Sequence, residues 1–466
     1  MLGKISGLTM SNFIVTDRKT DYLLPPSVSD WLGEDHLARF VVEVIDQLDL
    51  SNLTRQYAGR GSKAHHPATL LAILVYGYAT GVFSSRRLER ATYDSVAFRY
   101  IAANSHPDHD TLATFRRRFL DELASLFVQV LEYAQELKLL KLGTVCLDGT
   151  KIHANASRHS ALSHGHIEKL EVQLKAEVQE LLSLAEQADQ ADLPDGVSLP
   201  EEIKRREDRL AAMAKAKAKI ATSAAERYAQ EKAEYDEKMA HRAAKEKDTG
   251  KKPGGRVPKA PEPGPKDSDQ INLTDEESRI MPVAGGGYEQ AYNAQAAVDA
   301  ATMLVVATGV TQAPNDKEQV EPMLKTLDAQ AETLGAVERL MADTGYSSEK
   351  NIKACEAAHI EPLIAVAKEE HHPGWRERHS EPAALPAEAT PMQAMAHRLK
   401  TKAGRAAYAL RKQTVEPVFG IIKSVMGFRQ FLLRGLEKVT GEWSLVCLAW
   451  NIKRMAVLRP NWASSP

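Results

Sequence analysis

Two aspartates follow short apolar stretches of the chain in the same way. Asp148 follows residues 144–147, Thr-Val-Cys-Leu, and precedes a glycine. Asp343 follows residues 337–342, Val-Glu-Arg-Leu-Met-Ala, and precedes Thr-Gly-Tyr. Such runs predict buried strands, each of which would end on a carboxylate. Carboxylates are ligands for hard divalent cations, but Asp148 taken alone fits a cap of the following turn equally well.

A third acid, Glu416, lies in the segment 408–423, YALRKQTVEPVFGIIK. Thr414 would cap a helix with Glu416 and Pro417 in its first turn, where proline is tolerated. Lys423 would share a helical face with Glu416. The basic residues around this glutamate are Arg398, Lys400, Lys402, Arg405, Arg411, Lys412, Arg429, Arg434 and Lys438. A salt-bridged helix face is the commoner explanation for a single glutamate in such surroundings.

Cleavage of a phosphodiester bond by two divalent ions requires several carboxylates, which can come from separate helices and strands. One carboxylate bridges the two metals, which lie about 4 Å apart, and others complete each coordination shell. Asp299, Asp316 and Glu318 compete for this assignment. Asp299 lies in a predicted turn and the other two at the start of a predicted helix, so a turn or capping role fits them better. Tyr346 either approaches the substrate or packs over the strand end.

The composition is that of a globular protein with more than one domain. The chain has 466 residues, of which 43% are hydrophobic, and a net charge of −2. A nucleic-acid surface would therefore need local segregation of charge. The three cysteines lie far apart in apolar contexts, which excludes a disulfide scaffold and indicates a reduced, cytoplasmic protein. Neither a signal peptide nor a run long enough to span a membrane is evident.

Residues 1–142 predict an all-α region. Apolar residues recur at helical spacing in the stretches 37–50, 68–81, 84–100, 111–123 and 126–140. A set of this kind predicts a helical bundle of about one domain's size. Asp110 would cap the fourth helix, which carries Arg116, Arg117 and Arg118 about two turns further on. This arginine triplet fits either a phosphate-facing helix or a solvated charged face.

The remaining chain predicts an α/β domain that is interrupted by an insertion. Residues 167–188 and 200–245 have near-heptad apolar spacing and predict a helical hairpin broken at 194–196, followed by a Lys-, Pro- and Gly-rich linker. We therefore expect an insertion at 161–285 in a domain formed by 143–160 and 286–460.

After the insertion, the sequence of the α/β domain predicts strands at 292–299, 303–311, 337–342 and 362–366, with helices between them. Asn315 or Asp316 would cap the first of these helices. This order is typical of an α/β sheet, with Asp148 and Asp343 at the ends of two strands. A terminal helix would pack on the sheet through an apolar stripe that includes Trp443 and Trp450.

Five segments together resemble one family. They are LDGTKIHANAS from residue 147, LTDEESRIM from 273, MADTGYSS from 341, YALRKQTVEPVFGIIK from 408 and LVCLAWNIKRM from 445. Over nearly its whole length the chain resembles transposases of bacterial insertion sequences, of the DDE type, in the branch with a helical N-terminal domain. A single motif such as Asp-Gly-Thr is weak evidence, but five in the family's order are specific.

The resemblance implies a ribonuclease-H-like α/β catalytic core with an all-α N-terminal domain and a long helical-hairpin insertion. It assigns Asp148, Asp343 and Glu416 as catalytic ligands of two Mg²⁺ ions, for which Mn²⁺ could substitute. The implied reaction is cleavage and strand transfer at the terminal inverted repeats of the element. The implied partners are double-stranded DNA, as repeats and as target, and further copies in a homodimer or larger oligomer, at the bacterial nucleoid and not at a membrane.

The predicted DNA contacts are Tyr408, Arg411, Lys412 and Lys423 near the cut, and Arg116, Arg117 and Arg118 in the helical domain. Four residues separate Arg411 from Glu416, where the family's motif often has three. Two other functions would use the same residues. A metal-dependent nuclease would cut without joining, and an inactive remnant would bind DNA without Mg²⁺-dependent cutting.

Overall fold

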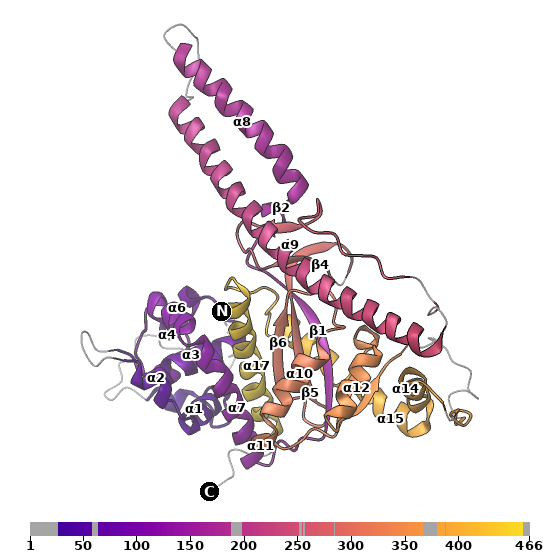
Figure 1. The fold of residues 1–466 in the computed structure, drawn as a ribbon. Coiled ribbons are helices and arrows are strands. Elements are labelled where there is room, and N and C mark those ends of the chain that lie inside the picture. Colours follow the sequence, from indigo (N-terminus) through magenta and orange to yellow (C-terminus); the bar gives the residue numbers. More distant parts are fainter. Residues whose placement is uncertain are drawn as a thin grey trace, which may run out of the picture.

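The computed structural model describes residues 27–57, 64–187, 198–250, 254, 257–283, 285–366, 380–386 and 388–459. A mixed sheet forms the centre of the molecule, a cluster of N-terminal helices packs beside it, and a two-helix arm extends away from both (Figure 1). Helix α17 (Leu436–Leu458) runs between the helical cluster and the sheet. The architecture is therefore mixed α/β with a helical N-terminal region, as the sequence predicts.

The N-terminal cluster follows the predicted apolar stretches. Its helices are α1 (Leu37–Gln47), α2 (Ser51–Arg55), α3 (Pro67–Thr80), α4 (Ser85–Asp94), α5 (Val96–Ile101), α6 (His109–Arg118) and α7 (Leu120–Glu136). The N-cap of α6 is Asp108 and not the predicted Asp110, because the Asp108 carboxylate accepts a hydrogen bond from the backbone N–H of Thr111. No single helix in the described part of the chain is long and apolar enough to cross a membrane; α3 and α4 reach that length only as a pair bent by 96°.

The central sheet has six strands: β1 (Thr144–His153), β4 (Arg279–Pro282), β5 (Tyr288–Asp299), β6 (Val305–Thr311), β7 (Arg339–Ala342) and β8 (Glu361–Ile364). β6, β5 and β1 are antiparallel neighbours, and β7 and β8 continue the sheet parallel to β1. β4 pairs with the first part of β5, beyond the end of β6. The predicted hairpin and the two later strands are thus confirmed.

Strand β1 continues past Asp148, where the sequence predicted its end. It runs to His153, and every residue from Val145 onward has a partner on β5. Thr150 and Ile152 are buried in alternation, which is the period of a strand with one covered face. Pairing with β7 stops at Leu147, however. Asp148 is therefore the first residue of β1 beyond its parallel neighbour.

Further helices of this region are α10 (Val320–Ala329), α11 (Ala331–Leu334), α12 (Glu349–Ala357), α14 (Pro391–Lys400), α15 (Lys402–Ala409) and α16 (Val415–Gly420). Of these, α10, α12, α14 and α16 contact strands of the sheet. Helix α17 is fixed to the sheet by its indole groups, since Nε1 of Trp443 donates to the carbonyl of Gln295 and Nε1 of Trp450 to that of Met303, both at 2.9 Å. This confirms the predicted stripe. One continuous apolar core joins the N-terminal helices, α17 and the sheet.

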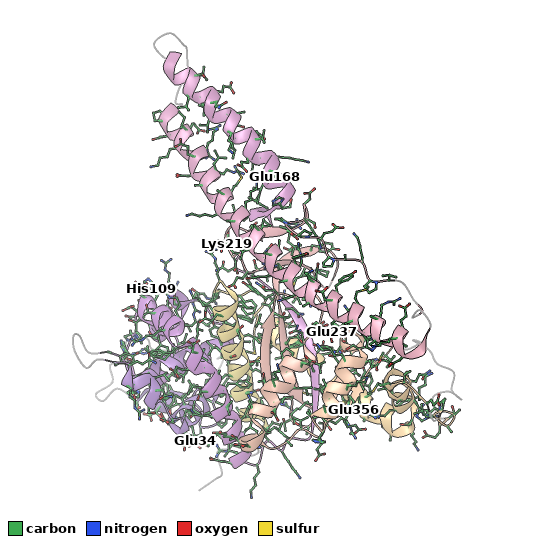
Figure 2. All side chains as sticks on the ribbon, in the orientation of Figure 1. Glu34, His109, Glu168, Lys219, Glu237 and Glu356 are labelled. Carbon is green, nitrogen blue, oxygen red and sulfur yellow. The ribbon has the colours of Figure 1, made fainter. Side chains whose placement is uncertain are left out.

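The arm confirms the two helices of the predicted hairpin. Helix α8 (His164–Gln187) begins at a small ribbon of β2 (Ala161–Ser163) and β3 (Gln270–Asn272). Helix α9 (Leu199–Thr249) begins at the far end of the arm, runs back along α8 and continues well past the ribbon (Figure 1). The predicted break at 194–196 lies outside the described residues. A separate small core holds the base of the arm: Leu162, Ile167, Leu174, Met213, Ala216, Ile220 and Ile271. Charged side chains project along both helices, with Glu168 and Lys219 near the base (Figure 2).

Candidate functional site

The three predicted acids meet at one guanidinium group. Nη2 of Arg411 lies 2.9 Å from Oδ2 of Asp148 and 3.7 Å from Oδ2 of Asp343, and Nη1 lies 3.2 Å from Oε1 of Glu416. The two aspartate oxygens are therefore at most 6.6 Å apart, the sum of their distances to the shared nitrogen. Residues separated by up to 268 positions of the chain thus contribute to one site.

Neighbouring elements explain this convergence. Leu147 and Ala342 are paired in the parallel ladder of β1 and β7, so Asp148 and Asp343 are the residues that follow equivalent positions on adjacent strands. Glu416 comes from the first turn of α16, as predicted. Arg411 comes from the 3-10 helix Leu410–Gln413 just before it. Thr414 precedes α16 but makes no side-chain cap, because its hydroxyl donates to the carbonyl of Leu410 instead.

The three carboxylates differ in exposure. The Asp148 side chain is 16% exposed, whereas those of Asp343 and Glu416 are 40% and 53% exposed. Burial raises the pKa of Asp148 to about 6; the Arg411 guanidinium opposes this rise, and the nearby Asp343 and Asp316 carboxylates add to it. The charge of Asp148 therefore depends on a nearby cation.

The raised pKa of Asp148 predicts pH-dependent cation binding. Below pH 6 protons compete with the cation for this carboxylate, so we expect Mg²⁺ affinity to fall by up to roughly tenfold per pH unit there and to level off above pH 7. Isothermal titration calorimetry between pH 5 and 8 measures this. Asp299→Asn is the control, because Asp299 is also a buried acid with a raised pKa but binds Thr302 in a turn. An affinity that stays constant from pH 5 to 7 would contradict the prediction.

The three acids offer the right kind of ligand atom for a divalent cation, but in this structure they do not surround a position where one could bind. Their oxygen atoms are the donors that Mg²⁺ prefers. In the part of the chain that the structure describes, however, no three acidic, His or Cys side chains surround a common point where an ion could bind. The Arg411 guanidinium lies among the acids, and its buried Nε has no hydrogen-bond partner. A cation between these carboxylates would therefore require Arg411 to move away.

Two of the other predicted DNA contacts also lie at this site. The Tyr408 hydroxyl donates to the carbonyl of Ala342, the residue before Asp343, at 3.3 Å. Nζ of Lys423 donates to the carbonyl of Lys151 on β1 at 2.9 Å, and burial lowers the pKa of Lys423. Lys412 is exposed next to Arg411. Tyr408 thus contacts the strand end that precedes Asp343, and Lys423 contacts β1 three residues past Asp148.

Arg116, which was predicted to contact DNA, does not lie on the surface. Its side chain is buried, and Nη1 donates to the Tyr78 hydroxyl at 3.0 Å and to the Phe83 carbonyl at 3.1 Å. The Tyr78 hydroxyl in turn donates to Glu442 of α17 at 2.7 Å. Arg116 is therefore part of the contact between the helical cluster and α17. Arg117 and Arg118 are exposed, so contact of these two residues with DNA stays a prediction.

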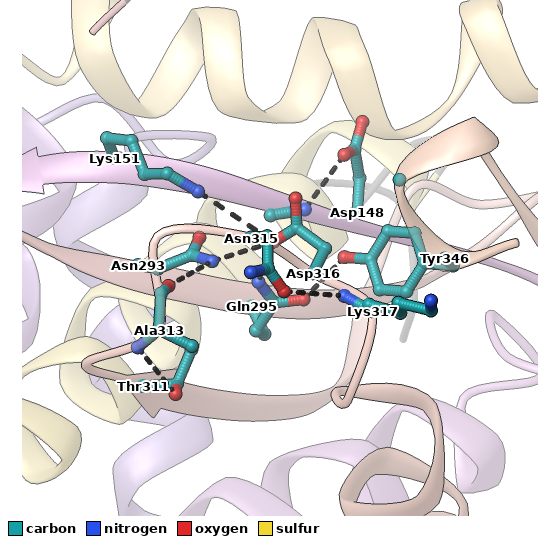
Figure 3. Close-up of polar contacts among 12 residues, drawn as sticks. Asp148, Lys151, Asn293, Gln295, Thr311, Ala313, Asn315, Asp316, Lys317 and Tyr346 are labelled. Carbon is teal, nitrogen blue, oxygen red and sulfur yellow. Dashed lines mark hydrogen bonds and ion pairs between the residues drawn. The ribbon is translucent and has the colours of Figure 1, made fainter. Parts of the chain in front are cut away.

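Asp316 belongs to the site, and the predicted capping role for it is wrong. Helix α10 begins at Val320 after Gln319, too late for Asp316 to be its cap. Instead, Oδ1 of Asp316 accepts hydrogen bonds from the amides of Asn293 and Gln295, both at 2.7 Å, and lies 3.8 Å from Nζ of Lys151 (Figure 3). A signal for this was present in the sequence. Asn293 and Gln295 are two residues apart on a strand, so both amides point to one face and need a polar partner there.

Comparisons with known proteins find two transposase domains in the chain. The family model described as Transposase domain (DUF772) matches residues 26–118, which include α1 to α6. The model described as Transposase DDE domain matches residues 259–452, which include Asp343 and Glu416, while Asp148 precedes the match. Searches of curated proteins and of solved structures gave no match. The two transposase models together span more than half of the chain, which therefore belongs to the insertion-sequence transposases of the DDE type.

Proposed function

We propose that this transposase cuts and joins DNA at the terminal inverted repeats of its element, with Asp148, Asp343 and Glu416 holding two Mg²⁺ ions. The observation that carries the proposal is the meeting of these three acids at the Arg411 guanidinium. Like charges repel when they converge in a partly buried site, so such a group persists only around a positive charge. An arginine supplies that charge here, and divalent cations would supply it during the reaction.

The strand order supports a ribonuclease-H-like core. Within the proposed catalytic segments 143–160 and 286–460, the strands in chain order are β1, β5, β6, β7 and β8. The first three form an antiparallel unit, and the last two add in parallel on the other side of β1. Asp148 is then on the first of these strands and Asp343 directly after the fourth.

In the proposed reaction the acids hold the metal ions, and the basic residues and Tyr408 bind phosphates. Bound Mg²⁺ would lower the pKa of the attacking water and stabilise the leaving 3′ oxygen. Asp148 offers a carboxylate fixed by the backbone of β1, and Glu416 offers a more exposed one. Arg411 leaves the acids when cations replace it and then binds a DNA phosphate, as Tyr408, Lys412 and Lys423 also do. The freed 3′-hydroxyl attacks the target DNA, so no protein nucleophile is needed.

We assign residues 1–142 to DNA binding and dimerisation and the insertion 161–285 to contacts within a homodimer or larger complex. Arg117 and Arg118, which lie at the exposed end of α6, are the proposed phosphate contacts of the first region. The insertion suits protein contacts because its helices extend away from the sheet (Figure 1). Its charges are mixed in sign; Lys217, for example, pairs with Glu168 and Glu171 across the two helices.

A single assay tests the proposed reaction. The transposase is incubated with Mg²⁺, a duplex that ends in the element's inverted repeat, and supercoiled target DNA. We expect a nick at the repeat and a product in which the repeat is joined to the target. A nick without a joined product would indicate a nuclease instead. Absence of both in Mg²⁺ and in Mn²⁺ would overturn the proposal.

Removal of the arm tests its assigned role. Replacing residues 167–245 with a short Gly-Ser linker should leave the main core folded, because the arm has a separate small core of its own. We expect the pairing of two DNA ends to fall by about tenfold or more, since linked binding events depend on contacts that bring the copies together. Native gels that resolve single-end from paired-end complexes measure this. Unchanged pairing would show that the arm is dispensable.

A further inference from the structure

Asp316 is anchored far more firmly than an ordinary loop carboxylate. Its Oδ1 accepts hydrogen bonds from Asn293 and Gln295, whose side chains are 0% and 1% exposed. Gln295 is fixed in turn by the hydroxyl of Tyr346, which is also fully buried (Figure 3). Buried amides hold their partners strictly, because loss of either hydrogen bond would leave a desolvated polar group. The position of this carboxylate is therefore determined by β5.

The anchored carboxylate lies against the strand that carries Asp148. Gly149 faces Gln295 across the β1–β5 pair. A Cβ atom at Gly149 would lie 2.4 Å from Oδ1 of Asp316 and 2.3 Å from Nε2 of Gln295, which is closer than real contacts allow. The residue after Asp148 thus leaves the space that Asp316 occupies.

Lys151 forms an ion pair with Asp316. Its Nζ lies 3.8 Å from Oδ1 of Asp316, and its side chain is 16% exposed. An ammonium group has three donors, yet within the residues that the structure describes Lys151 donates no side-chain hydrogen bond. The facing Asn293 is fully buried, and its Oδ1 also has no partner. Burial lowers the pKa of Lys151, while the carboxylates of Asp316, Asp148 and Asp343 raise it.

A second cation reaches the same place. Nζ of Lys423 binds the backbone carbonyl of Lys151. The two ammonium groups belong to different elements and approach one stretch of β1, three residues past Asp148. Burial lowers the pKa of Lys423 and the positive charge of Lys151 helps to lower it, so an anion beside the two lysines, in addition to the Asp316 carboxylate, would stabilise both charges. In a DNA-processing enzyme, the anion with this chemistry is a backbone phosphate.

We propose that Asp316 is a positioning residue of the active site, which holds the ammonium group of Lys151 for contact with a phosphate of the bound DNA end. This inference rests on the proposed function, because the phosphate belongs to the proposed substrate. It adds two residues, Asp316 and Lys151, to the site without assigning either to metal binding.

The test compares DNA affinity and its salt dependence, without divalent metal, for wild type and three variants. Asp316→Asn keeps the shape and an acceptor for Asn293 and Gln295 but removes the charge that orients Lys151. We expect this variant and Lys151→Gln each to bind the DNA end about tenfold more weakly. Each should also reduce the slope of log K against log salt concentration by about 0.9, the value of one phosphate contact. The double variant should bind no more weakly than either single variant.

Glu318→Gln is the matched control. Glu318 is an exposed acid two residues from Asp316 that pairs with Lys350, and its substitution removes the same charge. We expect equal or slightly tighter DNA binding and an unchanged salt slope for this control, with thermal unfolding confirming that all variants are folded. Loss of a negative charge alone would tighten DNA binding, so equal or tighter binding by Asp316→Asn would overturn its positioning role. An unchanged slope in Lys151→Gln would overturn the phosphate contact. If the wild type failed to bind its element's ends, that result would contradict the proposed function and not the positioning role of Asp316.

Discussion

Asp148→Asn, Asp343→Asn and Glu416→Gln are each expected to reduce Mg²⁺-dependent cleavage of the element's ends by about a thousandfold or more, with affinity for those ends nearly unchanged. Each substitution keeps the size of the side chain and removes one anionic oxygen ligand. The attacking water and the leaving oxygen then lose the cation that stabilises both, whereas the proposed DNA contacts come mainly from basic residues that these substitutions leave in place. A nicking assay on end duplexes measures the rate, and a gel shift in EDTA measures the affinity.

Two other acids provide controls for this prediction. Asp299 is buried in a turn, where it accepts hydrogen bonds from the backbone N–H and the hydroxyl of Thr302. Glu318 is exposed and pairs with Lys350. Asp299→Asn and Glu318→Gln should therefore cleave at nearly the wild-type rate per folded molecule. An active variant among Asp148→Asn, Asp343→Asn and Glu416→Gln would remove that residue from the catalytic set.

The positions of the three acids could be predicted because each signal is local. An apolar β-prone run before Asp148 or Asp343 indicates a strand, and a Thr-Val-Glu-Pro sequence indicates a helix start at Glu416. The meeting of these acids is not local, and it was inferred from the family resemblance. The structure agrees with it through the contacts of Arg411.

Other features depend on tertiary contacts that sequence patterns do not specify. Strand β1 continues past Asp148 because β5 supplies partners for Gly149 to His153, although the apolar run has ended. Asp316 precedes a helix, which favours a cap, yet the buried amides of β5 bind it instead. Arg116 stands in a charged triplet, which favours an exposed face, but the packing of α17 buries this one residue. In each case a long-range partner overrides the local preference.

Arg116→Met is expected to lower the free energy of unfolding by about 2–4 kcal/mol. Glu442 is fully buried, burial raises its pKa, and the positive charge of Arg116 opposes that rise. Without the arginine, the Glu442 charge keeps only the Tyr78 hydroxyl and the backbone N–H groups of Leu432 and Leu433. A buried charge without its counter-charge is strongly destabilising. Urea unfolding at neutral pH measures the change.

Two further variants separate this effect from a general loss at α6. Arg117→Gln changes the neighbouring exposed arginine and should alter stability by less than about 0.5 kcal/mol. Adding Glu442→Gln to Arg116→Met removes the unpaired charge and should recover part of the loss. If Arg116→Met were as stable as Arg117→Gln, the network of Arg116, Tyr78 and Glu442 would not stabilise the contact with α17.

The most direct test of the central claim is the number of Mn²⁺ ions bound per chain, measured by electron paramagnetic resonance in the presence of an uncleavable end duplex. If Asp148, Asp343 and Glu416 form one two-metal site, the wild type should bind two ions tightly, and each of Asp148→Asn, Asp343→Asn and Glu416→Gln should lose at least one of them. Asp299→Asn should keep both. Equal Mn²⁺ binding by the wild type and all three site variants would contradict the account.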